Sequence, residues 1–187
     1  MQLARISIEP ADTRHIVEKL REQECDLAIG NVPEAPAALR KQLLFAQKAC
    51  CIVSADHPEI RGQVTMDHFR RYPHVVWGTE PVSLRSIETS VVQALAGDAS
   101  IYQNAMRVPN VTMVPAVVAA TDMVATIPAR IAEEVSELYR LQRLPPPVQL
   151  PNADISMYWH ELMHRDAAHI WFRELVAGVI GERRAER

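Results

Sequence analysis

The chain has 187 residues, of which 48% are hydrophobic and 23% charged, the composition of an ordinary globular protein rather than a disordered one. Its 20 basic and 23 acidic side chains are mixed along the sequence and give a formal charge of −3, so no electrostatic footprint for a nucleic-acid backbone is visible. No apolar run reaches the roughly 18 residues of a membrane span, and Met1–Arg5 lacks the order of a signal peptide, which predicts a cytoplasmic protein without membrane contact.

The first segments predict a strand, a helix and a second strand. Leu3–Ile8 alternates apolar and polar residues, the pattern of a strand with one buried face. Pro10 ends this strand, Asp12 is a suitable N-cap, and an apolar stripe carries a helix to about Glu24. The run Cys25–Gly30 is nearly all apolar, so we expect parallel strands that are covered on both faces.

The middle of the chain continues this alternation of short strands and helices. The expected strands are 39–45, 49–53, 74–78, 106–108 and 123–127, and the expected helices are 66–71, 83–96, 116–120 and a segment from Ile131 to Leu138. Gly97 lies just past one of these helices, and Pro128 is expected to stop the last of these strands.

A proline-rich segment divides the rest of the chain. Leu144–Pro147 contains three successive prolines, which favour extended geometry, and we expect it to cross between two lobes. A strand over 154–159 and a terminal helix capped by Asp166 follow. This order predicts an α/β fold of two lobes, in which ligands bind at the carboxyl ends of strands, near helix N-termini that favour anions.

The three cysteines do not form a metal or redox motif. Cys25, Cys50 and Cys51 are odd in number and have no CxxC spacing. Because Cys50 and Cys51 lie in an apolar run, where a thiol behaves as a small hydrophobe, we expect them to be buried and reduced.

Several segments, taken in order, resemble the effector-binding domain of LysR-type transcriptional regulators. They are His15–Leu20 leading to Cys25–Gly30, Leu43–Phe45 followed by Cys51–Pro58, and Val111–Pro128, which ends in Met123–Pro128. A further similarity, of Met157–His160 and His164–Asp166, is to the subgroup of nodulation regulators and regulators that respond to aromatic acids. The chain departs from the family pattern at Thr121–Asp122, where glycine is usual, and at Glu24–Cys25, where glycine and an apolar residue are usual.

The resemblance implies a periplasmic-binding-protein-like fold of type 2, with two Rossmann-like lobes joined by crossover strands. One lobe would comprise residues 1–48 and 153–187, and the other residues 49–152. It further implies a sensor without catalytic activity or cofactor, which binds a small organic acid between the lobes, with an aromatic carboxylate as the more specific expectation. DNA would be bound only by a winged helix-turn-helix that lies outside this sequence, within a homodimer or homotetramer. The first strand and helix of lobe one would also be absent.

The expected effector-binding residues follow strands or lie at strand-to-helix junctions. For Ser83 a plain N-cap is the more frequent role, while Trp159 is equally suited to core packing and His160 to an ordinary hydrogen bond. The full set is Gly30, Asn31, Val32, His57, Gly78, Thr79, Ser83, Asn110, Val111, Trp159 and His160.

Two alternative functions use other features of the sequence. His160–His164 spells HExxH, which on a helix would place two imidazoles on one face for zinc, with Glu161 as general base of a hydrolase. The residues before it predict a strand and Asp166 begins a helix, so we expect a turn there and no metal site. The six glycines allow neither a P-loop nor a dinucleotide fingerprint. A transporter's solute-binding protein shares the fold but needs an export signal.

Overall fold

The computed structural model describes residues 5–9, 15–32, 35–78, 87–102 and 105–182. The chain divides into two compact units. Unit 1 consists of Met1–Ala46 together with Asp154–Arg187, and unit 2 is Gln47–Ala153. None of the helices in the described ranges is long and apolar enough to cross a membrane.

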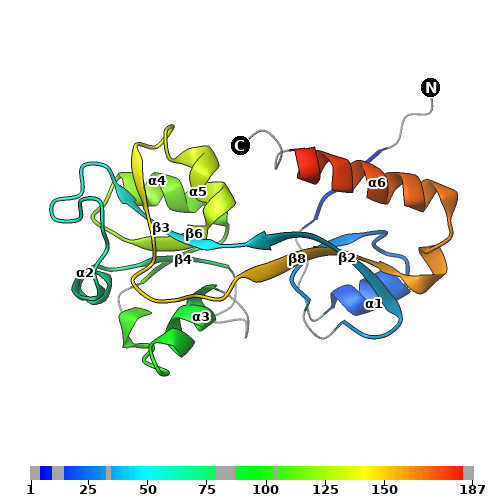
Figure 1. Ribbon diagram of the computed structural model, residues 1–187, viewed down its shortest axis with the longest axis horizontal. Coiled ribbons are helices and arrows are strands. Elements are labelled where there is room, and N and C mark those ends of the chain that lie inside the picture. Colours follow the sequence, from blue (N-terminus) through cyan, green and yellow to red (C-terminus); the bar gives the residue numbers. More distant parts are fainter. Residues whose placement is uncertain (1–4, 10–14, 33–34, 79–86, 103–104, 183–187) are drawn as a thin grey trace. The chain divides into compact units, whose positions relative to one another are not determined.

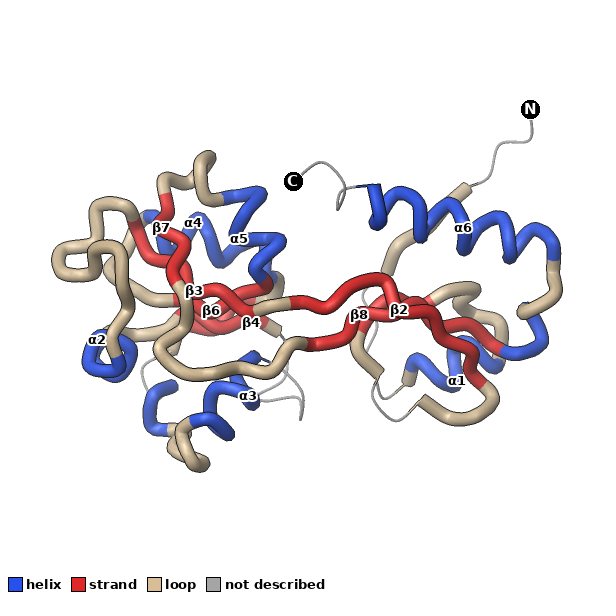
Figure 2. The backbone as a smooth tube through the Cα atoms, viewed as in Figure 1, coloured by secondary structure: helices blue, strands red, loops and turns tan. Residues whose placement is uncertain are grey.

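Unit 1 is built on a three-stranded sheet in the order β1-β8-β2. Figure 2 labels two of its strands, β2 and β8. Its strands are β1 (Ala28–Gly30), β8 (Ala153–His160) and β2 (Leu39–Gln47). Strand β1 runs antiparallel to β8, with Ala28 opposite Tyr158 and Gly30 opposite Ser156. The central strand of the sheet therefore comes from the opposite end of the sequence to its two neighbours.

Two helices pack against the sheet of unit 1. Helix α1 (Ile16–Arg21) buries Ile16 and Leu20 in a cluster that includes Tyr158. Neighbouring residues of a strand point to opposite faces, so Trp159 faces the other side of the sheet. There the guanidinium of Arg173, on helix α6 (Ala167–Glu182), lies 4.4 Å from the centroid of the Trp159 ring.

Unit 2 is built on a larger sheet. The central strand β3 (Ala49–Ser54) pairs antiparallel with β6 (Ala125–Pro128) on one side and with β7 (Leu141–Leu144) on the other. Strands β4 (Val75–Trp77) and β5 (Met106–Val108) pair parallel, and an isolated parallel bridge between His74 and Val124 connects them to β6.

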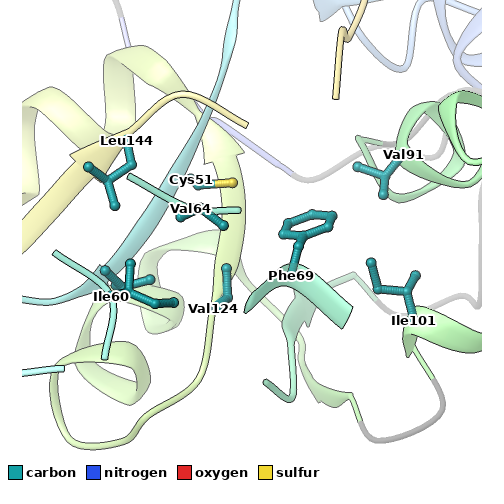
Figure 3. Close-up of a cluster of buried hydrophobic side chains, with 9 residues drawn as sticks. Cys51, Ile60, Val64, Phe69, Val91, Ile101, Val124 and Leu144 are labelled. Atoms are coloured by element: carbon teal, nitrogen blue, oxygen red, sulfur yellow. The ribbon is translucent and has the colours of Figure 1, made fainter. Parts of the chain in front are cut away.

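Helices cover both faces of this sheet, which explains why β3 is apolar as far as Val53 (Figure 1). Helices α4 (Val114–Ala119) and α5 (Ala129–Val135) pack on one face, in a cluster with Ile52. Helices α2 (Met66–Arg71) and α3 (Ile87–Ala94) pack on the other face, where Phe69 and Val91 join Cys51 and Val124 (Figure 3). Short 3-10 turns complete the chain at Ser100–Tyr102, Val111–Met113 and Glu161–Met163.

Side-chain caps fix several element ends. Thr65 and His68 form a reciprocal capping box at the start of α2. Asp166 accepts a hydrogen bond from the backbone N–H of His169 at 2.8 Å, as expected for the N-cap of α6. The turn at Thr121 needs no positive φ, because the Thr121 hydroxyl donates to the Val117 carbonyl and accepts from the Met123 N–H.

The structure differs from the predicted elements at five points. Residues 5–9 carry no strand, although their alternation predicted one, and β1 pairs antiparallel with β8 rather than parallel with a neighbour. Strand β6 includes Pro128, which was expected to stop it. Strand β7 was not predicted at all. Of the helix expected over 83–96, only residues 87–94 are helical among those described.

Candidate functional site

The end of β1 holds the first group of expected ligand-binding residues. Gly30 has open space where a Cβ would stand, and Asn31 is half-buried. The backbone N–H of Val32 donates to the Tyr158 hydroxyl at 3.1 Å, and that hydroxyl lies 3.3 Å from the Val32 carbonyl. The backbone of Val32 is therefore held by Tyr158, which leaves Gly30 and Asn31 as the accessible groups at this strand end.

The end of β4 holds the second group. Gly78 has φ +111°, a conformation that strains any L side chain, and its N–H donates to the Val108 carbonyl at 2.9 Å. Glycine thus allows the chain to turn sharply out of the sheet directly after Trp77. Thr79 and Ser83, expected to follow this turn, lie outside the described residues.

Asn110 has a capping role at the end of β5. Its Oδ1 accepts hydrogen bonds from the backbone N–H of Thr112 at 3.0 Å and from the Thr112 hydroxyl at 3.1 Å. This is an N-cap of the 3-10 turn that begins at Val111. A ligand here would have to use the amide nitrogen of Asn110, because the oxygen is already engaged.

His57 lies in the core of unit 2 and is fully buried. Its Nδ1 accepts from the backbone N–H groups of Glu59 and Ile60, so the proton lies on Nε2, which donates to the Asp122 carbonyl at 3.2 Å. The ring also meets Tyr72 edge-on, with centroids 4.5 Å apart. Both nitrogens are used, so the structure places His57 in a packing role rather than at an open ligand surface.

Burial lowers the pKa of two histidines in unit 2. Desolvation lowers the pKa of His57 and of His74 below the ordinary value of 6.5. The His74 ring is packed against Phe69 and Tyr102, and its Nε2 lies 2.7 Å from the Phe69 carbonyl. In both cases the folded state favours the neutral ring.

We therefore expect unit 2 to lose stability in mild acid. The unfolded chain takes up protons on these two rings as the pH falls below 6.5, while the folded chain does not, so stability is fully present above 6.5 and declines below it. Thermal melts at pH 7.5 and pH 5.5 measure this decline. A His74→Asn variant should show a flatter pH dependence than the wild type. Equal slopes in the two proteins would contradict the prediction.

Trp159 and His160 lie at the opposite end of the unit 1 sheet from Gly30. Gly30 pairs with Ser156, while Trp159 and His160 extend past the beginning of β1. Trp159 is buried, and His160 Nδ1 accepts from the backbone N–H of Leu162. The structure therefore separates these two residues from the end of β1. Trp159 packs in the core, and His160 accepts an ordinary hydrogen bond.

The HExxH string forms a turn, as its context predicted. His160 ends β8 and residues 161–163 form a single 3-10 turn, so the two histidines do not share a helix face. Glu161 forms an ion pair with Arg40, which holds the pKa of the Glu161 carboxyl below its usual range. Among the residues that the structure describes, no group of three or more histidine, cysteine or acidic side chains could hold a metal ion.

The three cysteines are free thiols. Cys51 is fully buried, and burial raises the pKa of its thiol to about 12. Burial also raises the pKa of Cys50, although this residue, like Cys25, is only half-buried. The prediction of full burial is therefore confirmed for Cys51 and is wrong for Cys50.

A small cavity of about 50 Å³ in unit 2 was not predicted from the sequence. Lys48 brings a positive charge to it and Ser90 a hydroxyl, while Ile87 begins α3 at its edge. The complete lining is Gln47, Lys48, Ala49, Ile87, Ser90, Leu150, Pro151 and Ala153. A cation and a hydroxyl beside apolar walls suit the carboxylate of a small organic acid, and the volume suits that group rather than a whole aromatic ring.

An ion pair between the buried Glu88 and the partly exposed Arg107 stabilises the wall next to this cavity. Glu88 of α3 is buried, and both its carboxylate oxygens accept from Arg107 of β5, at 2.9 and 3.2 Å. The same guanidinium lies 3.4 Å from the carbonyl of Trp77, the last residue of β4. Bidentate pairing fixes the first turn of α3 beside the end of the parallel strand pair. The only sequence signal for this pair is an acid in the first turn of a predicted helix.

A family model and the curated relatives identify the same protein family. The family model described as the LysR substrate binding domain matches residues 3–180. SyrM, an HTH-type transcriptional regulator of Rhizobium meliloti, is 30% identical over 158 residues, which are 84% of this chain and 48% of SyrM. NahR, an HTH-type transcriptional activator of Pseudomonas putida, is 30% identical over 162 residues, which are 86% of this chain and 52% of NahR. The chain thus spans about half the length of these curated relatives.

Solved structures agree on the fold. A putative transcriptional regulator from Vibrio parahaemolyticus superimposes with a TM-score of 0.80 at 25% identity, over 95% of this chain and 82% of that one. The regulatory domain of MexT, a transcriptional activator in Pseudomonas aeruginosa, gives 0.73 at 20% identity, over 89% of this chain and 80% of that one.

Proposed function

The chain belongs to the LysR substrate-binding domain family, and from this we propose that it is the effector-sensing part of a transcriptional regulator. The observation that carries the proposal is the family match over residues 3–180, which leaves almost none of the chain outside the domain. The curated relatives are named as HTH-type regulators and are about twice as long. DNA binding would then belong to a helix-turn-helix part that is not in this chain, within a homodimer or homotetramer.

We propose a small organic acid as the effector. The support is chemical: Lys48 and Ser90 stand at one small cavity, and a charge-assisted hydrogen bond from an ammonium to a carboxylate is about twice as strong as a neutral one. The apolar neighbours Ile87 and Leu150 would accept the carbon skeleton next to the carboxylate. An aromatic skeleton is the more specific form of the proposal.

Switching would follow from differential affinity. A ligand shifts an equilibrium between two arrangements of a protein only as far as it binds one of them more tightly. Lys48 is the single residue between β2 and β3, so a ligand held at Lys48 acts directly on the backbone that connects these strands. A regulator needs such a coupling between the binding of an effector and the geometry of its chain.

A thermal-shift titration tests this proposal. Dialysed protein is titrated with benzoate, salicylate, succinate and acetate, and at least one of them should raise the melting temperature in a saturable way. At a ligand concentration 100 times Kd, binding adds about 2.7 kcal/mol to the stability of the folded state. If none of these acids stabilises the protein, the effector class is wrong.

Two matched lysine variants test whether the organic acid binds at Lys48. Lys48→Gln should weaken binding of the active acid by about tenfold or more, because a hydrogen bond between charged groups contributes about 1.5–3 kcal/mol. Lys41→Gln, which changes an exposed lysine on β2, should leave the affinity unchanged. Equal affinities of the two variants would place the acid elsewhere in the molecule.

A further inference from the structure

Helix α3 is attached to the rest of unit 2 through two residues on one side of the helix. Val91 is fully buried and packs in the apolar cluster around Phe69 (Figure 3). Glu88, three positions earlier, is 5% exposed and pairs with Arg107 of β5. Apolar packing has no preferred direction, whereas a bidentate ion pair fixes the direction of both side chains. The Glu88–Arg107 pair therefore sets the rotation of α3 about its own axis.

The two α3 residues that line the small cavity lie on an adjacent face of this helix. Ile87 directly precedes Glu88, and Ser90 directly precedes Val91. One position along an α-helix corresponds to a rotation of about 100° around its axis. The rotation that the ion pair sets therefore decides where the Ile87 side chain and the Ser90 hydroxyl point relative to Lys48. Arg107 has this effect from outside, since it is not among the described residues that line the cavity.

The Arg107 guanidinium is itself held in place by two chain segments. It donates to both carboxylate oxygens of Glu88, at 2.9 and 3.2 Å, and lies 3.4 Å from the carbonyl of Trp77, which ends β4. The Arg107 backbone belongs to β5 and pairs with Val76 of β4. A helix of only eight residues is too short to be stable alone and takes its position from such contacts. Arg107 thus joins α3 to the parallel strand pair.

The ion pair contributes more to direction than to net stability. The Glu88 carboxylate loses its hydration on burial, and attraction to a cation offsets that cost only when the geometry is good. Well-packed apolar residues of similar volume can often replace a buried ion pair without loss of stability. They do not reproduce the fixed direction of two parallel N–H···O bonds. The effect of the pair on position can therefore be measured separately from its effect on stability.

We propose that Arg107 is a positioning residue of the acid-binding cavity. It acts through Glu88, which sets the rotation of α3 and thereby places Ile87 and Ser90 beside Lys48. This role rests on the proposed function, because it concerns the affinity of the cavity for an organic acid. The coupling is reciprocal, so an acid held between Lys48 and Ser90 favours the same position of α3 and should slow amide exchange in that helix.

A double variant separates positioning from stability. Glu88→Met combined with Arg107→Met replaces the ion pair with unbranched apolar side chains, and the melting temperature should stay within about 4 °C of the wild type. The probes are benzoate, salicylate, succinate and acetate, titrated against the full 187-residue chain. Affinity for the acids that bind the wild type should fall about tenfold, because Ser90 is no longer held in place. Arg70→Met, which removes an exposed ion pair with Asp98, should bind them with wild-type affinity.

A conservative variant guards against misfolding of the double variant. Arg107→Lys keeps the charge but loses the planar fork, so it should remain folded and bind the acids with intermediate affinity. Wild-type affinity in Arg107→Lys or in the double variant would overturn the proposal. So would losses of affinity and of melting temperature that run in parallel across the variants, because the pair would then have a structural role only.

Amide exchange in the acid-free proteins is a second readout that needs no effector. In the double variant the amides of Val91 and Val92 should exchange about tenfold faster, because the first turn of α3 is no longer held, while exchange in β3 should not change. If none of the four acids binds the wild type, the effector proposal fails, and this readout alone decides the role of Arg107. Unchanged exchange in α3 would overturn that role.

Discussion

Replacing Phe69 with alanine is expected to destabilise unit 2 by about 3–5 kcal/mol, the usual cost of deleting a fully buried aromatic ring. Phe69 is completely buried between Val91 and Ile101 on one side and the sheet residues Cys51 and Val124 on the other (Figure 3). Its removal leaves a cavity at the centre of this cluster, because the surrounding elements are held by the β-sheet and cannot collapse into it.

The loss would be a large part of the 5–15 kcal/mol that stabilises a typical domain. Amide hydrogen exchange of β3 measures it, since this central strand opens only when unit 2 unfolds. Exchange should accelerate by about 100-fold or more, at about 1.4 kcal/mol per factor of ten. Leu138→Ala is the control: this side chain is 79% exposed, and its loss should change exchange little. A rate for Phe69→Ala close to that of the control would contradict the packing described for this cluster.

Replacing Arg173 with alanine is expected to destabilise unit 1 by about 3 kcal/mol, because it leaves buried hydrogen-bond acceptors without a donor. Arg173 is buried and lies over the Trp159 ring. Its guanidinium donates to His169 Nδ1 at 2.6 Å and to the carbonyls of Met163 and His164 at 3.3 and 3.0 Å. One side chain thus ties α6 to the turn after β8.

Urea unfolding monitored by amide exchange in β8 would measure this effect. Arg173→Lys keeps the charge but loses the planar fork, so its destabilisation should be intermediate. Arg165→Ala, an exposed arginine of the same region, should remain within about 0.5 kcal/mol of the wild type. If Arg173→Ala were as stable as Arg165→Ala, the guanidinium would not be the link between α6 and the sheet.

Elements with strong local signals were predictable from the sequence. Helix α2 begins after Thr65 and ends before Pro73, and it covers the residues expected for it because its cap and its terminator are both local. Strand β5 likewise has the predicted bounds. Strand β3 is apolar from Ala49 to Val53, and the coverage of the unit 2 sheet on both faces accounts for that composition.

Elements that depend on distant partners were not predictable. Strand β7 has the sequence Leu141–Gln142–Arg143–Leu144, which does not alternate cleanly, and it exists because β3 offers an edge to it. Residues 5–9 show the converse, since they have a good strand pattern but pair with no strand in the described part of the chain. Local pattern specifies what a segment can become, while pairing decides whether it does.

The residues of the candidate site likewise include some that the sequence predicts and some that it does not. Gly78 was predicted from its place after a strand, and its positive φ agrees with the sharp exit from β4. Lys48 and Ser90, in contrast, belong to no sequence motif. They line the same cavity because the fold brings them together. Trp159 was expected near the other ligand residues, but the antiparallel register of β8 carries it to the far end of the sheet.

The order of strands in unit 1 also governs the order in which the nascent protein can fold. Strand β8 is central in that sheet but is synthesised after all of unit 2, and Tyr158 contacts Val32 across a separation of 126 residues. Unit 2 is continuous in sequence, so it can complete its core while the ribosome is still adding the final segment. Until β8 has been synthesised, strands β1 and β2 lack their pairing partner. Unit 1 therefore folds last and most slowly, because its contacts join the most distant parts of the sequence.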